Sequence, residues 1–204
     1  MKEQSIKNVI FDFGQVMVRF DPYAIAAHTL DDADDVALLV PVLFDRAYWD
    51  KLDAGTISDG EVLEAVCARL PERLCQAAGH IYYSWIYHLP EIPGMPELVQ
   101  GLKARGVPVA LLSDISHYFV SHAHEIPVLA LFDYCVFSSD LGVNKPDVRM
   151  FQKACEGGNL DPAQTLFVDD KPSNVQGARD FGLQAYLFDG DAAALQAYLD
   201  QHLD

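Results

Sequence analysis

The sequence predicts an α/β fold in three layers, with a parallel sheet between helices and an all-helical insertion after the first strand. Short, continuously apolar segments recur along the 204 residues, and helix patterns separate the later ones. Unbroken apolar runs are typical of strands buried on both faces, and strand–helix alternation favours parallel pairing. The insertion is indicated by the stretch 20–89, which has helix signals and no convincing strand.

Five segments are expected to form the strands of the sheet. All are rich in hydrophobic residues and show no polar alternation. In chain order they are NVIFDF (8–13), VPVALLS (107–113), YCVFSS (134–139), TLFVDD (165–170) and QAYLFD (184–189).

Helix patterns lie between the later strands, at 93–106, 145–158 and 171–182. Each pattern ends in glycine, the residue that most often terminates a helix. In the second pattern Val148, Phe151, Ala154 and Cys155 fall on one face, and the final glycine pair is expected to end the helix.

The insertion carries its own helix signals. Ser58 is followed by Glu61 at capping-box spacing, and Pro71 closes that helix. The sheet pattern resumes near Pro93. We therefore expect residues 1–19 and 90–204 to form the sheet domain and residues 20–89 to form a helical cap.

Charge and composition exclude several classes of partner. The formal net charge of −16 disfavours nucleic acid and anionic membranes, because no basic stripe is present to neutralise phosphates. Four cysteines without C-x-x-C spacing, each in an apolar segment, favour buried free thiols in a reducing compartment. A polar N-terminal segment and the absence of a long apolar run predict a cytoplasmic location.

Polar side chains follow three of the predicted strands. Because the carboxyl ends of parallel strands meet at one edge of a sheet, these side chains are expected to converge there. They are Asp12, Ser113, Asp114, Asp169 and Asp170, and the loop LGVNKP adds Lys145.

Each of these residue types has a use in phosphoryl transfer. A carboxylate can attack phosphorus, and a hydroxyl with backbone N–H groups can hold phosphate oxygens. A lysine opposes developing negative charge. The acid pair and the first aspartate can hold Mg²⁺, which prefers oxygen ligands.

Four of these segments together resemble a known family. Asp12 in FDFG, Ser113 in LLSD, Lys145 in NKPD and the acid pair in FVDDKPSN resemble, in order, the four motifs of the haloacid dehalogenase-like hydrolases. The resemblance covers residues 8 to about 188 and implies a Rossmann-like core with a helical cap. SSDLGVNKPDVRMF and LFVDDKPSNVQGAR look most like the bacterial α-D-glucose-1-phosphate phosphatase branch.

The resemblance implies a magnesium site. Asp12 would be both the nucleophile and a metal ligand, and Gly14 would give its backbone carbonyl to the metal. Asp170, supported by Asp169, would complete the protein's share of the ligands. Asn174 would orient an acid or a metal-bound water.

The resemblance also implies a phosphate site made by Ser113, Asp114 and Lys145. Trp49, in the predicted cap, is a candidate for substrate contact, because the cap must supply whatever recognises the leaving group. The expected partner is a small phosphorylated metabolite, with a sugar phosphate favoured, and the chain is expected to be a monomer or a homodimer.

Gly14 departs from most phosphatases of this superfamily, which have an aspartate there to protonate the leaving oxygen. General acid–base help is worth about 10²- to 10⁴-fold, so its loss would slow turnover without abolishing it. Gln15 can orient water but cannot act as a base. Asp21, Asp50 and Asp53 are alternative sources of the missing carboxyl group.

The leading prediction is a Mg²⁺-dependent phosphatase that acts through a phospho-aspartate on Asp12. Two alternatives stay open. A 2-haloacid dehalogenase also uses an aspartate nucleophile, but it would leave the acid pair Asp169–Asp170 unexplained. A weakened family member that only binds a phosphorylated ligand is suggested by Gly14 alone.

Overall fold

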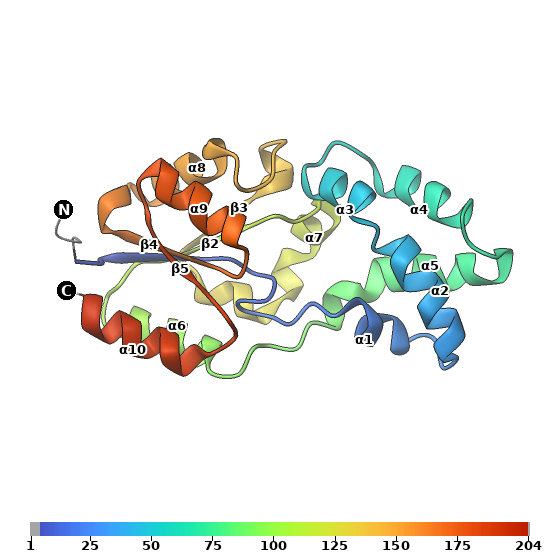
Figure 1. Ribbon diagram of the computed structural model, residues 1–204, viewed down its shortest axis with the longest axis horizontal. Coiled ribbons are helices and arrows are strands. Elements are labelled where there is room, and N and C mark those ends of the chain that lie inside the picture. Colours follow the sequence, from blue (N-terminus) through green and yellow to red (C-terminus); the bar gives the residue numbers. More distant parts are fainter. Residues whose placement is uncertain (1–4, 204) are drawn as a thin grey trace.

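A five-stranded parallel sheet forms the centre of the computed structural model, which describes residues 5–203 (Figure 1). The strands are β1 (Asn8–Phe11), β2 (Val109–Ser113), β3 (Tyr134–Phe137), β4 (Thr165–Asp169) and β5 (Gln184–Leu187). Their order is β3-β2-β1-β4-β5, and all four pairings are parallel. The predicted parallel α/β fold is confirmed, and β1 lies at its centre.

Helices cover both faces of the sheet (Figure 1). One face carries α8 (Val148–Gly158) and α9 (Pro172–Phe181), and the other carries α6 (Met95–Ala104) and α10 (Ala192–His202). Successive strand residues point to opposite faces. Ile10 accordingly packs in the cluster that contains residues of α8 and α9, whereas Val9 and Phe11 pack in the cluster on the α6 side.

Short helices complete the core between β2 and β4. They are α7 (His117–His122), η2 (Ala123–Glu125), η3 (Pro127–Leu131), η4 (Ser138–Asp140) and η5 (Pro162–Gln164). Of these, η4 matters for the site, because it follows β3 at the carboxyl edge of the sheet and contacts a helix of the insertion.

The insertion between β1 and α6 is entirely helical, and we call it the cap (Pro22–Tyr87). Its elements are α1 (Pro22–Ala27), α2 (Ala33–Leu43), α3 (Arg46–Asp53), α4 (Asp59–Cys67), α5 (Glu72–Ser84) and η1 (Trp85–Tyr87). The predicted capping box is present, because Ser58 and Glu61 exchange side-chain to backbone hydrogen bonds at the start of α4.

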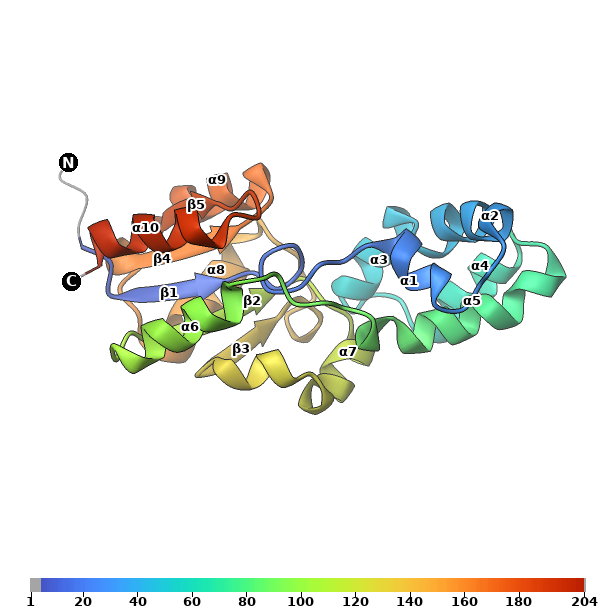
Figure 2. The same cartoon turned by 90° about the horizontal axis from the view of Figure 1, so that it is seen from below.

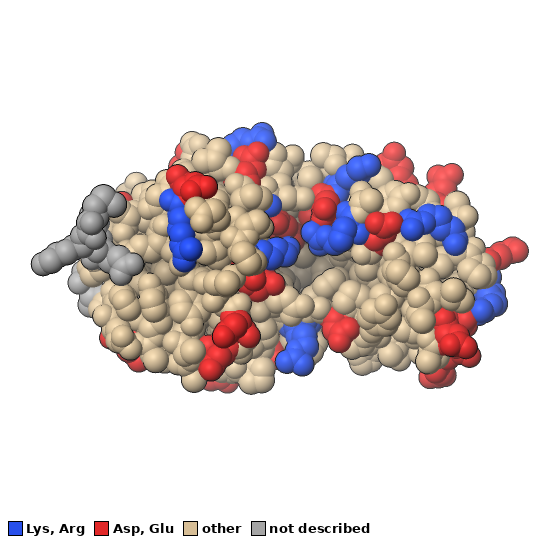
Figure 3. All heavy atoms as spheres, in the orientation of Figure 1, with Lys and Arg blue, Asp and Glu red and all other residues tan. Residues whose placement is uncertain are grey.

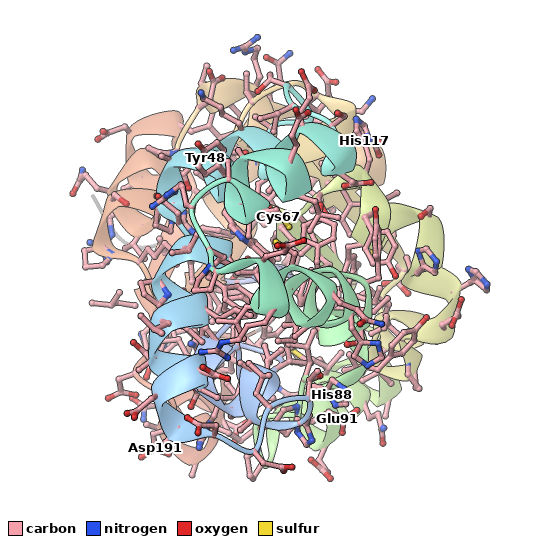
Figure 4. The ribbon with its side chains drawn as sticks, turned by 90° about the vertical axis from the view of Figure 1, so that its right-hand side faces the viewer. Tyr48, Cys67, His88, Glu91, His117 and Asp191 are labelled. Carbon is pink, nitrogen blue, oxygen red and sulfur yellow. The ribbon has the colours of Figure 1, made fainter. Side chains whose placement is uncertain are left out.

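Two segments join the cap to the core and run side by side (Figure 2). Arg19 N donates to Pro90 O at 2.8 Å, and Ile92 N donates to Met17 O at 2.9 Å. Val18 and Glu91 form an antiparallel bridge between them. In Figure 4, which looks onto the cap, Glu91 lies beside His88, far from His117 of the core helix α7, which lies on the opposite side of the view. The cap is therefore tethered by a paired connection at one end.

The structure corrects two details of the predicted helix at 145–158. Val148 is 54% exposed rather than buried, because it is the first residue of α8, and Met150 takes the buried position. The helix also continues through both glycines and ends at Asn159, which adopts the left-handed conformation with φ 51°.

Two further features bear on the expectations from composition. No helix within residues 5–203 is long and apolar enough to span a membrane. The four cysteines have free thiols, but only Cys155 is buried, and the other three are half-buried.

Candidate active site

A cavity of about 280 Å³ lies between the core and the cap, at the carboxyl ends of β1, β2 and β4. Figure 3 shows the corresponding hollow, with acidic and basic side chains at its edge. Core residues that line it include Asp12, Gly14, Ser113, Asp114 and Asp170. The strand order brings these residues together, because β2 and β4 are the two neighbours of β1.

Three carboxyl groups meet at this edge. Asp12, Asp169 and Asp170 each offer an oxygen, and these oxygens lie within 4.8 Å of one another. Asp12 and Asp169 are buried, and Asp170 is partly buried. Among the described residues this is the one group of three or more His, Cys, Asp or Glu side chains close enough to hold a metal ion.

Lys145 places its ammonium group between two of these acids. Its Nζ lies 2.6 Å from Asp12 Oδ1 and 2.9 Å from Asp169 Oδ2, and it donates to Leu112 O at 3.0 Å. An ammonium has three donors, and these three oxygens use all of them. The lysine therefore orients the two carboxylates in this structure, and it does not line the cavity where a phosphoryl group was expected to meet it.

The pKa values in this cluster follow from burial and mutual charge. Burial raises the pKa of Asp12 to about 7, although Lys145 opposes the rise. Burial alone would lower the pKa of Lys145, but the charges of Asp12, Asp169 and Asp114 raise it, so the ammonium stays protonated. The pKa of Asp170 is raised by burial and by the charge of Asp169. A further cation would relieve this excess of negative charge.

The two acids after β4 differ in their partners. Asp169 accepts from Lys145 Nζ, from Lys171 N at 2.8 Å and from Asn174 Nδ2 at 3.2 and 3.0 Å. Asp170 Oδ1 is buried and accepts no hydrogen bond from the described residues. A buried carboxylate oxygen without a donor fits a cation ligand. The three carboxylates of this cluster offer only oxygen ligands, which suit Mg²⁺.

Ser113 and Asp114 stand on the neighbouring strand end. The Ser113 hydroxyl makes only a long contact of 3.5 Å to Asp114 O, so it is free to bind an oxyanion in the cavity. Asp114 Oδ1 accepts from Lys145 N at 2.8 Å and thereby holds the loop that carries the lysine. Burial raises the pKa of Asp114.

The turn after β1 explains the position of Gly14. Phe13 N donates to Asp12 Oδ1 at 2.7 Å, which fixes the carboxylate at the strand end. Gln15 has φ 60°, and its side chain donates to Phe20 O at 2.8 Å. A Cβ on Gly14 would meet no atom within 4 Å. Space for a longer side chain is therefore present at this position, and the sequence leaves it empty.

Of the three alternative acids, one reaches the cavity. Asp21 caps α1 by accepting from Tyr23 N and Ala24 N. Asp50 is exposed and paired with Arg46. Asp53 lines the cavity.

One face of α3 turns toward the cavity. Arg46, Trp49 and Asp53 follow one another at helical spacing and all line it. Trp49, the predicted substrate contact, is buried, and its indole N–H donates to Leu43 O at 2.6 Å. Its ring therefore forms part of the wall, together with Phe20 and Trp85, which it contacts.

The sequence prediction missed Arg46, Phe20, Trp85, Leu89 and Lys171 as cavity residues. The spacing of Arg46, Trp49 and Asp53 is the available signal, but it is also the pattern of an ordinary amphipathic helix.

The end of α3 is fixed to the core by three close approaches. Asn144 Nδ2 donates to Asp50 O at 2.7 Å, and Ser138 Oγ donates to Asp53 O. Gly55 follows with φ +64°, and a Cβ there would lie 2.6 Å from His117 Nε2 and 2.8 Å from Ser139 O. These contacts hold the cap over the strand ends.

Comparison with known proteins matches the haloacid dehalogenase-like hydrolase family over residues 6–182. D-ribitol-5-phosphate phosphatase of Bacteroides thetaiotaomicron is 27% identical over 195 residues, which cover 89% of this chain and 91% of the relative. (S)-2-haloacid dehalogenase 4A of Burkholderia cepacia is 32% identical over 95 residues, or 46% of this chain and 41% of the relative.

Acyl-CoA dehydrogenase family member 10 of Mus musculus is 23% identical over 202 residues, which cover 95% of this chain but 19% of the mouse protein. The chain thus spans about a fifth of this relative and about two fifths of the Burkholderia enzyme.

Solved structures show the same fold. An L-2-haloacid dehalogenase superposes with a TM-score of 0.73 at 19% identity, covering 97% of this chain and 100% of the other. A HAD family enzyme of Bacteroides thetaiotaomicron, in complex with magnesium and inorganic phosphate, gives a TM-score of 0.69 at 18% identity, covering 93% and 98%. With the family match over most of its length, the chain belongs to the haloacid dehalogenase-like hydrolases, with a Rossmann-like core and a helical cap.

Proposed function

We propose that the chain is a Mg²⁺-dependent phosphatase that hydrolyses a small sugar phosphate through a phospho-aspartate on Asp12. The observation that carries this proposal is the cluster of Asp12, Asp169 and Asp170, with its unpartnered buried oxygen on Asp170. A dehalogenase reaction needs no metal, so it would not explain why three carboxyl groups lie together here. The phosphatase of Bacteroides thetaiotaomicron, similar over most of both chains, supports the same choice.

Asp12, Gly14 and Asp170 would hold the metal, and Asp169 would support it. When bound, Mg²⁺ supplies positive charge against the phosphoryl oxygens and the carboxylates. Lys145 orients Asp12 toward the cavity through its 2.6 Å contact, and Asn174 keeps Asp169 in place. Ser113 would hold one phosphoryl oxygen. Asp12 then attacks phosphorus, and water hydrolyses the resulting acyl phosphate.

The two parts of the chain would divide the work. We propose that residues 1–19 and 90–204 form the catalytic core and that residues 20–89 act as a cap that excludes bulk water. The cavity is small, about 280 Å³, which suits a monosaccharide phosphate better than a larger ligand. Trp49 would offer its ring to the sugar, and α-D-glucose 1-phosphate is the first substrate to test.

Phosphate release from a panel of sugar phosphates, with Mg²⁺ and with EDTA, tests the activity. We expect turnover only with the metal, and we expect Asp12→Asn to abolish it while leaving the circular dichroism spectrum unchanged. Chloride release from 2-chloropropionate without metal would instead establish a dehalogenase. No turnover of either class, with retained phosphate binding, would establish the weakened binding protein.

Thermal melting gives a readout of the metal that is independent of activity. A ligand at about one hundred times its dissociation constant stabilises the folded state by about 2.7 kcal/mol. We expect Mg²⁺ to raise the melting temperature of the wild type and not that of Asp170→Asn. Equal shifts in the two proteins would place the cation elsewhere.

A further inference from the structure

A carboxyl group on the cap faces the cavity without a partner. Asp53 is the last residue of α3, it is 6% exposed, and it lines the cavity. No side chain or backbone group within residues 5–203 donates a hydrogen bond to its carboxyl group. Buried carboxyl groups are normally hydrogen-bonded, so an unpaired one that faces a cavity is suited to meet a ligand.

The other carboxyl groups that line the cavity already have tasks. Asp12 and Asp170 belong to the acid cluster. Asp114 accepts a backbone hydrogen bond from Lys145, which holds its carboxylate in place and opposes the rise in its pKa that burial causes. Among the described residues that line the cavity, Asp53 is therefore the acid that neither belongs to the cluster nor accepts a hydrogen bond, which leaves it free to exchange a proton with a bound molecule.

The geometry of phosphoryl transfer points to the wall where Asp53 lies. The attacking and leaving oxygens stand roughly in line, on opposite sides of phosphorus. Asp12 attacks from the core, so the leaving oxygen points away from the strand ends and toward the cap. Arg46, Trp49 and Asp53 of α3 form part of the cap wall of the cavity. Of these three residues, Asp53 provides a carboxyl group.

We propose that Asp53 is the general acid and general base of the reaction, in place of the side chain that Gly14 lacks. The proposal rests on the phosphatase function above. In the first step Asp12 forms a bond to phosphorus, the bond from phosphorus to the leaving oxygen breaks, and the Asp53 carboxyl proton passes to that oxygen. In the second step the oxygen of a water molecule forms a bond to phosphorus while Asp53 takes its proton, the bond from the Asp12 oxygen to phosphorus breaks, and inorganic phosphate leaves.

The surroundings of Asp53 suit this role. Burial and the charge of Asp114 raise the pKa of Asp53 to about 7, against the opposing charges of Arg46 and Lys171. Asp50, on the preceding turn of the same helix, adds a smaller rise, and Asp53 in turn helps to raise the pKa of Tyr82 of α5. His117 of α7 also lies against this end of α3, next to Gly55. A general acid works best when its pKa lies near the working pH.

Core contacts fix the position of this group. Ser138 Oγ donates to the Asp53 backbone oxygen, and the same hydroxyl accepts from Ile115 N at 2.8 Å, two residues after Ser113. The backbone of Asp53 is thus connected through Ser138 to the end of β2, where Ser113 is the residue proposed to bind phosphate. Such support from a second layer of residues is what keeps a catalytic group in a productive geometry.

A leaving-group series with wild type, Asp53→Asn and Asp50→Asn tests the proposal. We expect Asp53→Asn to slow formation of the phospho-aspartate from a primary alkyl or sugar phosphate, measured in a single turnover, by about 10²- to 10⁴-fold. For 4-nitrophenyl phosphate, whose leaving group needs no proton, the same first step, measured as the pre-steady-state burst of 4-nitrophenol, should slow by less than about threefold, whereas the later hydrolysis of the phospho-aspartate should slow for every substrate. Asp50→Asn, on the exposed side of the same helix, should behave as the wild type throughout.

A rescue variant guards against a merely structural effect. Because a Cβ on Gly14 meets no atom within 4 Å, Gly14→Asp fits the turn and should restore alkyl phosphate turnover in the Asp53→Asn background. Equal losses of this first step for all leaving groups, or no rescue by Gly14→Asp, would overturn the role of Asp53 and leave the phosphatase function standing. An inactive wild type would overturn the proposed function itself.

Discussion

Replacing Asp53 by asparagine should change how the folding stability depends on pH, apart from any effect on catalysis. The pKa of Asp53 is raised from 3.8 to about 7, first by burial and then by the charge of Asp114. The folded state therefore keeps a proton that the unfolded state loses at lower pH. The contribution of this group to stability is full below about pH 4 and is lost as the pH rises through about 7.

The size of the effect follows from the two pKa values. One pKa unit corresponds to about 1.4 kcal/mol, so the shift of Asp53 amounts to about 4 kcal/mol over the whole titration. Between about pH 5 and about pH 8 the free energy of unfolding should fall by about 2–3 kcal/mol on account of this residue alone. In urea this corresponds to a midpoint lower by about 1 M.

Urea unfolding at the two pH values, for wild type and Asp53→Asn without Mg²⁺, measures this contribution. Asparagine cannot ionise, so the variant should lose less stability than the wild type on going to the higher pH. Other titrating groups, Asp12 among them, act equally in both proteins and cancel. Asp50→Asn is the matched control on the same helix. Identical pH slopes for wild type and Asp53→Asn would refute the burial of a protonated Asp53.

Two more substitutions test other contacts of the site. Lys145→Met should lower the free energy of unfolding by about 3–5 kcal/mol in urea without Mg²⁺, because Asp12 and Asp169 lose their buried counter-charge. An unchanged midpoint would contradict this ion cluster. Gly55→Ala should cost about 1–3 kcal/mol and raise KM, because its left-handed turn packs against the core. Gly60→Ala is the control, because a Cβ there meets open space. Equal melting temperatures for Gly55→Ala and Gly60→Ala would refute the close packing of Gly55 against the core.

The core of the site was predictable because parallel topology fixes where strands end. Each apolar run delivers its next polar residue to the same edge, whatever the loops do. The placement of Asp12, Ser113 and Asp170 around one cavity follows from this rule and from the adjacency of β2, β1 and β4. No detail of side-chain packing is needed to reach it.

The cap wall was less predictable, because it depends on how α3 docks on η4. Nothing in the local sequence separates Asp53 from Asp50, one turn earlier, which is exposed. The distinction comes from the core residues Ser138 and Asn144, whose side chains donate hydrogen bonds to backbone oxygens at the end of α3. A contact between segments more than eighty residues apart leaves no periodic signal.

The glycine pair in α8 shows a different limit. Gly157 and Gly158 resemble a helix stop, yet the helix runs through both. A Cβ on Gly157 would lie 2.8 Å from Tyr134 Cε2, and a Cβ on Gly158 would lie 2.7 Å from the Tyr134 hydroxyl oxygen. The glycines are there because the Tyr134 ring from β3 crosses the helix, so tertiary packing sets their placement rather than local conformation.

The charge of the site gives the strongest reason to expect a cation. Asp12, Asp169 and Asp170 face a single buried ammonium, that of Lys145, in a protein whose net charge is −16. A phosphate monoester would bring further negative charge into the same cavity. Lys171 and Arg46 lie at its wall, but within residues 5–203 neither of their charged side chains makes a hydrogen bond or ion pair to the acid cluster, and Lys171 donates only its backbone N–H to Asp169. An acidic protein can bind an anion only where the local field is reversed, and a divalent ion at Asp170 is the simplest way to reverse it.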